Sequence, residues 1–171
     1  WPQRCACDGR DSLMHLGFSS MNTVDDPAPG LLARTIEAAG SVPVRDGEHS
    51  HIPVSRKTPY PAGGELPAAY REMMDPYVSL MAAAAATTTL CLGTGIALLL
   101  ERELFSQAKT IATLDRLSGG RLMIGCGVGW NEEEFVNATR LHWGGKSLLT
   151  RNADISKSNL FTTLAAESPG G

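Results

Sequence analysis

The sequence predicts an α/β protein with parallel strands. Short, continuously apolar segments alternate with segments of helical periodicity from residue 14 to residue 129. Continuous apolar runs are typical of strands buried on both faces, and a strand–helix–strand order gives parallel pairing through right-handed crossovers. With 171 residues, of which 43% are hydrophobic, the chain is long enough for one domain with a substantial core.

The first strand–helix unit occupies residues 14–40. Met14–Ser20 is a short apolar run that ends in small polar residues, as a strand does. Asp25–Pro27 is a helix-start signal, and the helix predicted over Leu31–Ala39 ends at Gly40.

The second unit begins with a weaker strand at Val42–Val44. A loop rich in Pro and Gly follows and runs to about residue 68, and long loops after strands are often functional. Asp75-Pro76 then starts a helix over Tyr77–Thr87, because Asp is a good N-cap and Pro is harmless at the first helical position. Leu90–Leu100 is predicted to be the third strand.

The last unit has the strongest helical signal in the chain. Glu103–Leu117 carries an apolar stripe and is ended by Ser118-Gly119-Gly120. Arg121–Gly129 is then a fourth strand that enters a glycine-rich turn. Beyond Phe135 no periodicity persists, which predicts a loosely packed tail.

Charge and apolar patterning limit the partners. Fifteen Lys and Arg against eighteen Asp and Glu give a net charge of −3, which provides no general attraction for nucleic acid or anionic lipid. Leu80–Leu100 is apolar enough to raise the question of a membrane span. Thr87–Thr89 divide it into an Ala-rich half and a β-rich half, so a buried helix followed by a buried strand is predicted instead.

The N-terminus and the cysteines indicate the compartment. No continuous apolar segment precedes Leu13, so no secretory signal is visible. The four cysteines include no Cys-x-x-Cys pair, and two lie in apolar runs, which predicts reduced, buried thiols. We therefore expect a cytoplasmic protein.

Four motifs, in this order and spacing, carry a family resemblance. They are Glu48–Pro53 with the Pro-rich loop after it, Leu92–Ile96, Ala112–Arg121 and Gly125–Asn131. On these motifs the segment from residue 14 to residue 135 resembles the luciferase-like monooxygenase family of flavin-dependent and deazaflavin (coenzyme F420)-dependent oxidoreductases.

The resemblance implies a TIM (β/α)8-barrel type of fold, of which the chain would supply about four βα units. Residues 1–13 would be a disordered extension, residues 14–135 a half barrel and residues 136–171 a divergent tail. Two departures stand out. A proline and two charges occupy the second strand within Ser41–Asp46, and the resemblance stops after Phe135. Local changes of reading frame would produce both departures.

The resemblance also implies a site at the C-terminal ends of the strands. His49 is the first catalytic candidate, as a proton-transfer group, and Glu48 beside it would hold or polarise the imidazole ring. In the family a non-proline cis peptide commonly lies against the cofactor ring, and the matching bond here is Gly95–Ile96. The residues implied to bind the cofactor are Ser19, His49, Thr94, Gly95, Ile96, Gly129 and Trp130.

The implied cofactor is coenzyme F420, with FMN as the alternative, and the implied reaction is hydride transfer to or from a small organic substrate. Intact family members are expected to be homodimers. Gly125, Gly127 and Gly129 also follow a strand, but they lack the Gly-x-Gly-x-x-Gly spacing and the acidic residue of a dinucleotide-binding fold.

Two other functions remain open from the residues alone. Glu48, His49 and His51 have the spacing of a metal site at a strand end, as in metal-dependent barrel hydrolases. The third possibility is a barrel fragment with no activity of its own, because four units cannot close a barrel and leave unpaired edges.

Overall fold

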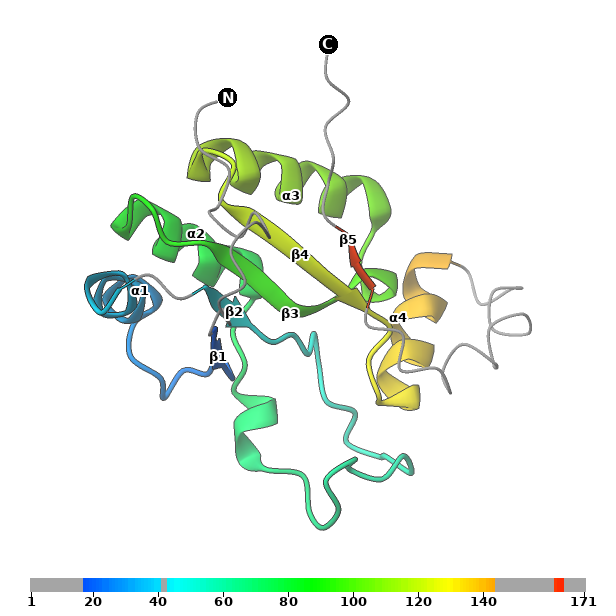
Figure 1. Cartoon of the computed structure of the whole chain (residues 1–171). Helices are drawn as coiled ribbons and strands as arrows, with labels where there is room; N and C mark the ends of the chain where they lie inside the picture. The colour runs from blue at the N-terminus through cyan, green and yellow to red at the C-terminus, as the bar shows by residue number, and fades with distance from the viewer. Residues whose placement is uncertain (1–16, 41–42, 144–161, 165–171) are drawn as a thin grey trace.

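The computed structural model describes residues 17–40, 43–143 and 162–164, and it confirms the α/β class (Figure 1). Four parallel strands form a sheet in the order β1-β2-β3-β4, and a short fifth strand pairs antiparallel with β4. The strands are β1 (Phe18–Ser20), β2 (Val44–Asp46), β3 (Leu92–Leu98), β4 (Leu122–Gly127) and β5 (Thr162–Leu164). The described residues form an open sheet and no closed barrel.

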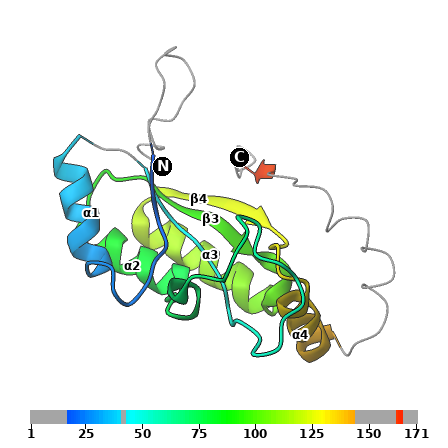
Figure 2. The same ribbon diagram turned by 90° about the horizontal axis from the view of Figure 1, so that it is seen from below.

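Three helices cover one face of the sheet. Figure 2 shows α1 (Pro29–Ala38), α2 (Pro76–Ala86) and α3 (Leu104–Ser118) side by side beneath the strands. A fourth helix, α4 (Glu132–Trp143), lies beyond the end of β4 and contacts the short helix η2 (Leu99–Glu101). The 3₁₀ helix η1 (Ala68–Arg71) interrupts the long loop between β2 and α2.

The predicted helix signals act as expected. The Asp75 carboxylate caps α2 by accepting hydrogen bonds from the backbone N–H groups of Tyr77 and Val78 at 2.9 and 3.0 Å. Gly119 ends α3 in the left-handed conformation, with φ of 75°, which is costly for other residues. Local chemistry therefore defines both helix ends.

The second strand forms despite its unfavourable composition. Val44 pairs with Phe18 on one side and with Leu92 on the other, so β2 is central to the sheet. Val44 and Asp46 are buried, whereas Arg45 between them is exposed on the opposite face. Pro43 lies just outside the strand, and its carbonyl accepts the Phe18 N–H, so proline removes no donor from the ladder.

The core lies between the helices and the sheet. Its buried members include Ile36 of α1, Leu80 of α2, Leu92 of β3 and Leu114 of α3. The buried Arg121 guanidinium joins the N-terminal edge of this core, donating hydrogen bonds to the carbonyls of Ala84, Thr87, Leu90 and Ser118. These bonds give Arg121 a structural role.

Several expectations need correction or fall outside the described residues. The helix α4 continues past Phe135, where no further periodic element was expected, and β5 was not predicted. Cys91 is disulfide-bonded, so the prediction of reduced thiols is wrong for this residue, whereas Cys126 is free. The predicted extension over residues 1–13 lies outside the described residues.

The apolar stretch that raised the membrane question divides as predicted, with α2 ending at Ala86 and β3 starting at Leu92. Within the described part of the chain, no helix has the length and apolar character needed to cross a bilayer.

Candidate functional site

Three chain segments meet at the C-terminal ends of the parallel strands. Glu48 and His49 follow β2, Glu101 lies at the end of η2 after β3, and Trp130 follows β4. The long loop after His49 is attached to α4, because the Glu133 carboxylate accepts the backbone N–H groups of Lys57 (2.8 Å) and Thr58 (3.3 Å). A hydrogen bond from the Thr58 side chain, together with these backbone bonds, lowers the pKa of Glu133 to about 2.

The partner of His49 is Glu134. The Nδ1 atom of His49 lies 2.6 Å from Oε2 of Glu134, and the two side chains are 8% and 1% exposed. A carboxylate only accepts hydrogen bonds, so this contact places a proton on Nδ1 and leaves Nε2 of the ring available for proton transfer. His49 therefore has the arrangement of a positioned acid–base group.

Glu48 has a different partner from the one expected. Its carboxylate accepts the Leu98 N–H at 2.7 Å and the Arg102 Nε–H at 2.5 Å. Arg102 also bonds Asp75 at 2.7 Å, so Glu48 belongs to an ion-pair network that links the ends of β2, β3 and α2. The role of orienting His49, which the sequence suggested for Glu48, falls to Glu134 in the structure.

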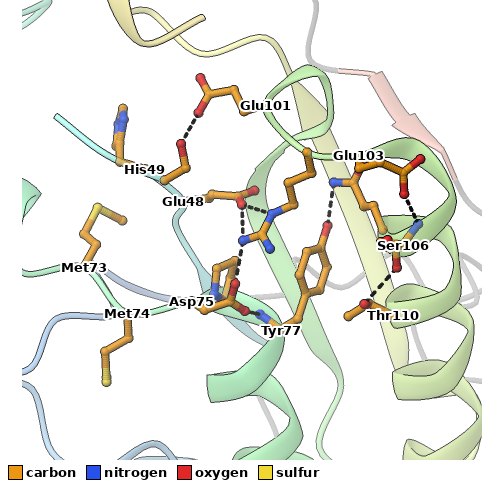
Figure 3. A pocket seen from close by; sticks show the side chains of 14 residues that line it. Glu48, His49, Met73, Met74, Asp75, Tyr77, Glu101, Glu103, Ser106 and Thr110 are labelled. Carbon is orange, nitrogen blue, oxygen red and sulfur yellow. Dashed lines mark hydrogen bonds and ion pairs between the residues drawn. The ribbon is translucent and has the colours of Figure 1, made fainter. Parts of the chain in front are cut away.

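Glu48 and His49 border a cavity of about 440 Å³. Figure 3 shows Glu48 directed across this cavity toward the side of Asp75 and Tyr77, while the His49 ring is directed away. Burial of the phenol raises the pKa of Tyr77 to about 12, so the Tyr77 hydroxyl remains protonated beside the ion pairs of Glu48, Arg102 and Asp75.

A second carboxyl lies behind His49. Glu101 is 5% exposed, and it hydrogen-bonds to Glu134 and accepts the Ser50 hydroxyl at 2.8 Å. Burial, reinforced by the charge of Glu134, raises the pKa of Glu101 to about 8. Two buried carboxyls in contact share one proton more easily than they both ionise, so Glu101 carries a proton at neutral pH.

The residues predicted as metal ligands, Glu48, His49 and His51, are not the three that the fold brings together. One ligand atom each from His51, Glu101 and Glu134 lies within 4.8 Å of the others, whereas Glu48 is engaged by Arg102. The three side chains hydrogen-bond to their protein neighbours, with His51 bonded to Ser50 Oγ at 2.9 Å. These contacts describe a hydrogen-bonded cluster rather than an open coordination site.

An aromatic cluster covers the outer side of His49. The His49 ring makes edge-on contacts with Tyr70 and Trp130, with centroids 5.1 and 5.6 Å apart, and Tyr60 contacts both of these neighbours. Arg56 lies over Trp130, 5.3 Å from the ring centroid. Tyr60 and Tyr70 of the loop thus form, with Trp130 after β4, a rim of flat side chains around the histidine.

The remaining predicted residues occupy different environments. The Gly95–Ile96 peptide is cis, as the resemblance implies, and Gly95 is exposed. Thr94 is buried, and its hydroxyl bonds the Gly125 carbonyl at 2.9 Å, so it faces protein. Ser19 is exposed on β1, and Gly129 has φ of 77° next to Leu98.

Glu134, Glu101 and Arg102 were not predicted from the sequence. A signal for Glu134 was present, since Asn followed by Glu132-Glu133-Glu134 is the sequence pattern of a helix start with an acidic first turn, although the Asn131 side chain accepts no capping hydrogen bond from the described residues. Asn131 is itself notable because both of its side-chain polar atoms are buried without a hydrogen-bond partner among the described residues.

Two kinds of similarity identify relatives of this chain. Uncharacterised proteins of Mycobacterium tuberculosis and Mycobacterium bovis are 41% identical over 127 residues, which are 72% of this chain and 45% of theirs. A monooxygenase from Streptomyces bottropensis has a TM-score of 0.58 at 23% identity, over 84% of this chain and 39% of its own.

The oxygenating constituent of 3,6-diketocamphane monooxygenase from Pseudomonas putida, solved with FMN, also has a TM-score of 0.58, at 17% identity. Its match covers 84% of this chain and 37% of that protein. The chain thus spans less than half the length of these relatives. The luciferase-like monooxygenase model matches residues 31–144, beyond the expected end of the resemblance at Phe135. The chain belongs to the luciferase-like monooxygenase family.

Proposed function

We propose that this chain forms part of a flavin-dependent or deazaflavin-dependent oxidoreductase that transfers hydride to or from a small organic substrate. F420 is the first proposed cofactor and FMN the alternative. The observation that carries the proposal is the buried His49–Glu134 pair beside Trp130 at the strand ends, together with the exposed Gly95 within β3. Family membership supports an oxidoreductase with a flavin-type cofactor.

The residues present fit a flat cofactor ring. Gly95 has no side chain and is exposed, so a planar group can approach its backbone closely. The Arg45 side chain lies on the same face, with its Cβ, Cδ and Cγ 3.2, 3.6 and 3.9 Å from the position of a Cβ on Gly95, and its guanidinium extends toward Gly17 at the start of β1. The orphaned amide of Asn131 adds a polar group with unused hydrogen bonds next to Trp130.

The bound cofactor would supply the hydride chemistry at C5 of a deazaflavin or N5 of FMN. Gly95, Ile96 and Trp130 would hold the ring, and Ser19 would contribute a hydroxyl from β1. His49 would accept or donate the accompanying proton at Nε2, while Glu134 keeps the other ring nitrogen protonated. The aromatic rim of Tyr60, Tyr70 and Trp130 would exclude water from the imidazole.

We also propose a homodimer. Exposed apolar side chains at the starts of α2 and α3 support a protein contact there, namely Val78 (70% exposed), Leu104 (54%) and Phe105 (81%).

Titration of the chain with F420 and with FMN, followed by cofactor fluorescence, tests the proposal. We expect saturable binding weaker than micromolar, because phosphate sites in this fold class come from loops after strands seven and eight. Tighter binding of F420 than of FMN supports the first cofactor. Absence of saturable binding of both contradicts the proposal.

Two glycines on the same strand provide a matched comparison. We expect Gly95→Val to weaken cofactor binding more than folding, since Gly95 is exposed and the atoms nearest to a Cβ there would belong to the Arg45 side chain, with its Cβ 3.2 Å away, and not to the backbone. We expect Gly93→Val mainly to lower the melting temperature, because a Cβ there would lie 3.2 Å from Arg45 Cγ and 3.3 Å from the Met123 carbonyl.

A further inference from the structure

A continuous series of hydrogen bonds leads from the buried His49 ring to the surface. His49 Nδ1 contacts Glu134 Oε2 at 2.6 Å, and Glu134 hydrogen-bonds to Glu101. Glu101 Oε2 accepts the Ser50 hydroxyl at 2.8 Å, and Ser50 Oγ lies 2.9 Å from Nδ1 of His51. The first three side chains are nearly inaccessible to solvent, whereas Ser50 is exposed and His51 is half-buried.

The members of this series come from three separate parts of the chain. His49, Ser50 and His51 are consecutive, but Glu101 and Glu134 belong to η2 and α4. Ser50 hydrogen-bonds to Glu101, and its neighbour His49 hydrogen-bonds to Glu134. Because the two carboxyls also contact each other, they connect two consecutive residues of one segment. If Glu134 served only to pair with His49, no second buried acid would be needed beside it. Contact between two buried carboxyls is costly unless they share a proton.

We propose that Glu134, Glu101 and Ser50 relay protons between His49 and the protein surface, an inference that rests on the proposed proton-transfer role of His49. Glu134 and Glu101 are positioning residues in this arrangement, because they act on the reaction through the histidine. The protonated state of Glu101 at neutral pH supports the relay, since a carboxyl that carries a proton can donate it to a neighbour.

The transfer conserves protons at each member. When His49 takes a proton at Nε2, its Nδ1 proton passes to Glu134, and Glu134 passes a proton to Glu101. The Ser50 hydroxyl, which donates to Glu101 at rest, turns toward Nδ1 of His51, whose ring carries its own proton on Nε2 in this step. Glu101 then gives a proton to Ser50 Oγ while the Ser50 hydroxyl proton passes to His51 Nδ1. Glu134 is again ionised, Glu101 and Ser50 are again protonated, and His51 releases the extra proton to solvent. The same transfers in the reverse order return a proton to His49 Nδ1.

Proton exchange at His49 Nδ1 tests the relay without any cofactor. In the full chain, nitrogen-15 NMR identifies the tautomer of each histidine, and saturation transfer from water measures how fast each ring N–H exchanges. Glu101→Gln is the key variant, because its amide can donate to Glu134 and accept from Ser50 but cannot pass a proton on. Glu132→Gln, an exposed position on the same helix as Glu134, is the control.

We expect Glu101→Gln to keep the proton on Nδ1 but to slow its exchange about 10-fold or more, because exchange then waits for local opening of the structure. Glu132→Gln should exchange as the wild-type chain does. Unchanged exchange in Glu101→Gln overturns the relay. If that variant does not fold, Ser50→Ala decides, since Ser50 is exposed and its loss should slow exchange while unchanged exchange again overturns the relay.

The result is separable from the proposed function. A relay that fails this test leaves the cofactor titration of the wild-type chain unaffected. A chain that binds neither F420 nor FMN would contradict the proposed oxidoreductase, whereas the exchange measurement would still report whether His49 communicates with the surface through Glu101.

Discussion

The Nδ1 atom of His49 and the Oε2 atom of Glu134 lie 2.6 Å apart although 85 residues separate them in the chain. The contact joins the end of β2 to the first turn of α4, so it fixes both the histidine ring and the position of the helix. Glu133, the preceding residue, holds the loop that follows His49. The first turn of α4 therefore holds both His49 and the loop that follows it.

Removal of the Glu134 carboxylate should destabilise the fold. Glu134→Ala leaves the buried His49 ring and Glu101 without their shared partner, and we expect the free energy of unfolding to fall by about 2–3 kcal/mol. Glu132→Ala, at an exposed position two residues earlier in α4, should change the free energy of unfolding by less than about 0.5 kcal/mol. Urea denaturation of both variants measures the difference, and equal stabilities would show that the pair contributes nothing.

The sequence predicted elements well where local chemistry defines them. Asp75-Pro76 and Ser118-Gly119-Gly120 act within one helical turn, and the predicted ends of α2 and α3 agree with the structure within about two residues. The weak strand at Val42–Val44 is shifted in the structure to Val44–Asp46, because pairing with β1 and β3 outweighs the charges of Arg45 and Asp46.

The site was harder to predict because its contacts are long-range. Glu48 is adjacent to His49, yet successive side chains of an extended segment point to opposite sides, so the neighbour was the wrong partner. Glu134 and Glu101 reach His49 only through the order of the strands in the sheet. A sequence alone places groups of this kind at one edge of a sheet but does not pair them.

The two glycines of β4, Gly125 and Gly127, should differ in their tolerance of a side chain. A Cβ on Gly125 would lie 2.5 Å from the backbone carbonyl oxygen of Thr94, which cannot move without distorting β3. A Cβ on Gly127 would meet the Cδ1 methyl of Ile96, the end of a side chain that can rotate. We expect Gly125→Ala to cost about 2–3 kcal/mol and Gly127→Ala about half as much. Thermal unfolding compares them, and a larger loss at Gly127 would contradict this account.

Glu133 should protect the long loop between β2 and α2 from cleavage by proteases. Its carboxylate accepts the N–H groups of Lys57 and Thr58, so Glu133→Gln weakens charge-assisted hydrogen bonds that hold the loop against α4. We expect trypsin to cleave after Arg56 and Lys57 several-fold faster in this variant, as local opening becomes easier. Glu132→Gln is the matched control and should be cleaved at the wild-type rate. Equal rates in both variants would mean that other contacts hold the loop.

Asp46 should make the stability of the protein depend on pH in an unusual direction. Its side chain is 6% exposed, and burial, with a smaller contribution from the charge of Asp26, raises its pKa from 3.8 to about 7. The unfolded chain therefore releases this proton at a lower pH than the folded chain does. Each step in pH from about 4 to about 7 favours the unfolded state, and the penalty is constant at higher pH.

Asp46→Asn removes that titration. We expect the variant and the wild-type chain to have similar stabilities near pH 4, and the variant to become progressively more stable than the wild type up to pH 7, by at most about 4 kcal/mol. Urea denaturation at pH 4, 5, 6, 7 and 8 measures the difference. Asp25→Asn, at an exposed neighbouring acid, is the control and should show no such trend. A stability difference between Asp46→Asn and wild type that stays constant from pH 4 to pH 8 would show that Asp46 ionises in the folded chain as it does in the unfolded one.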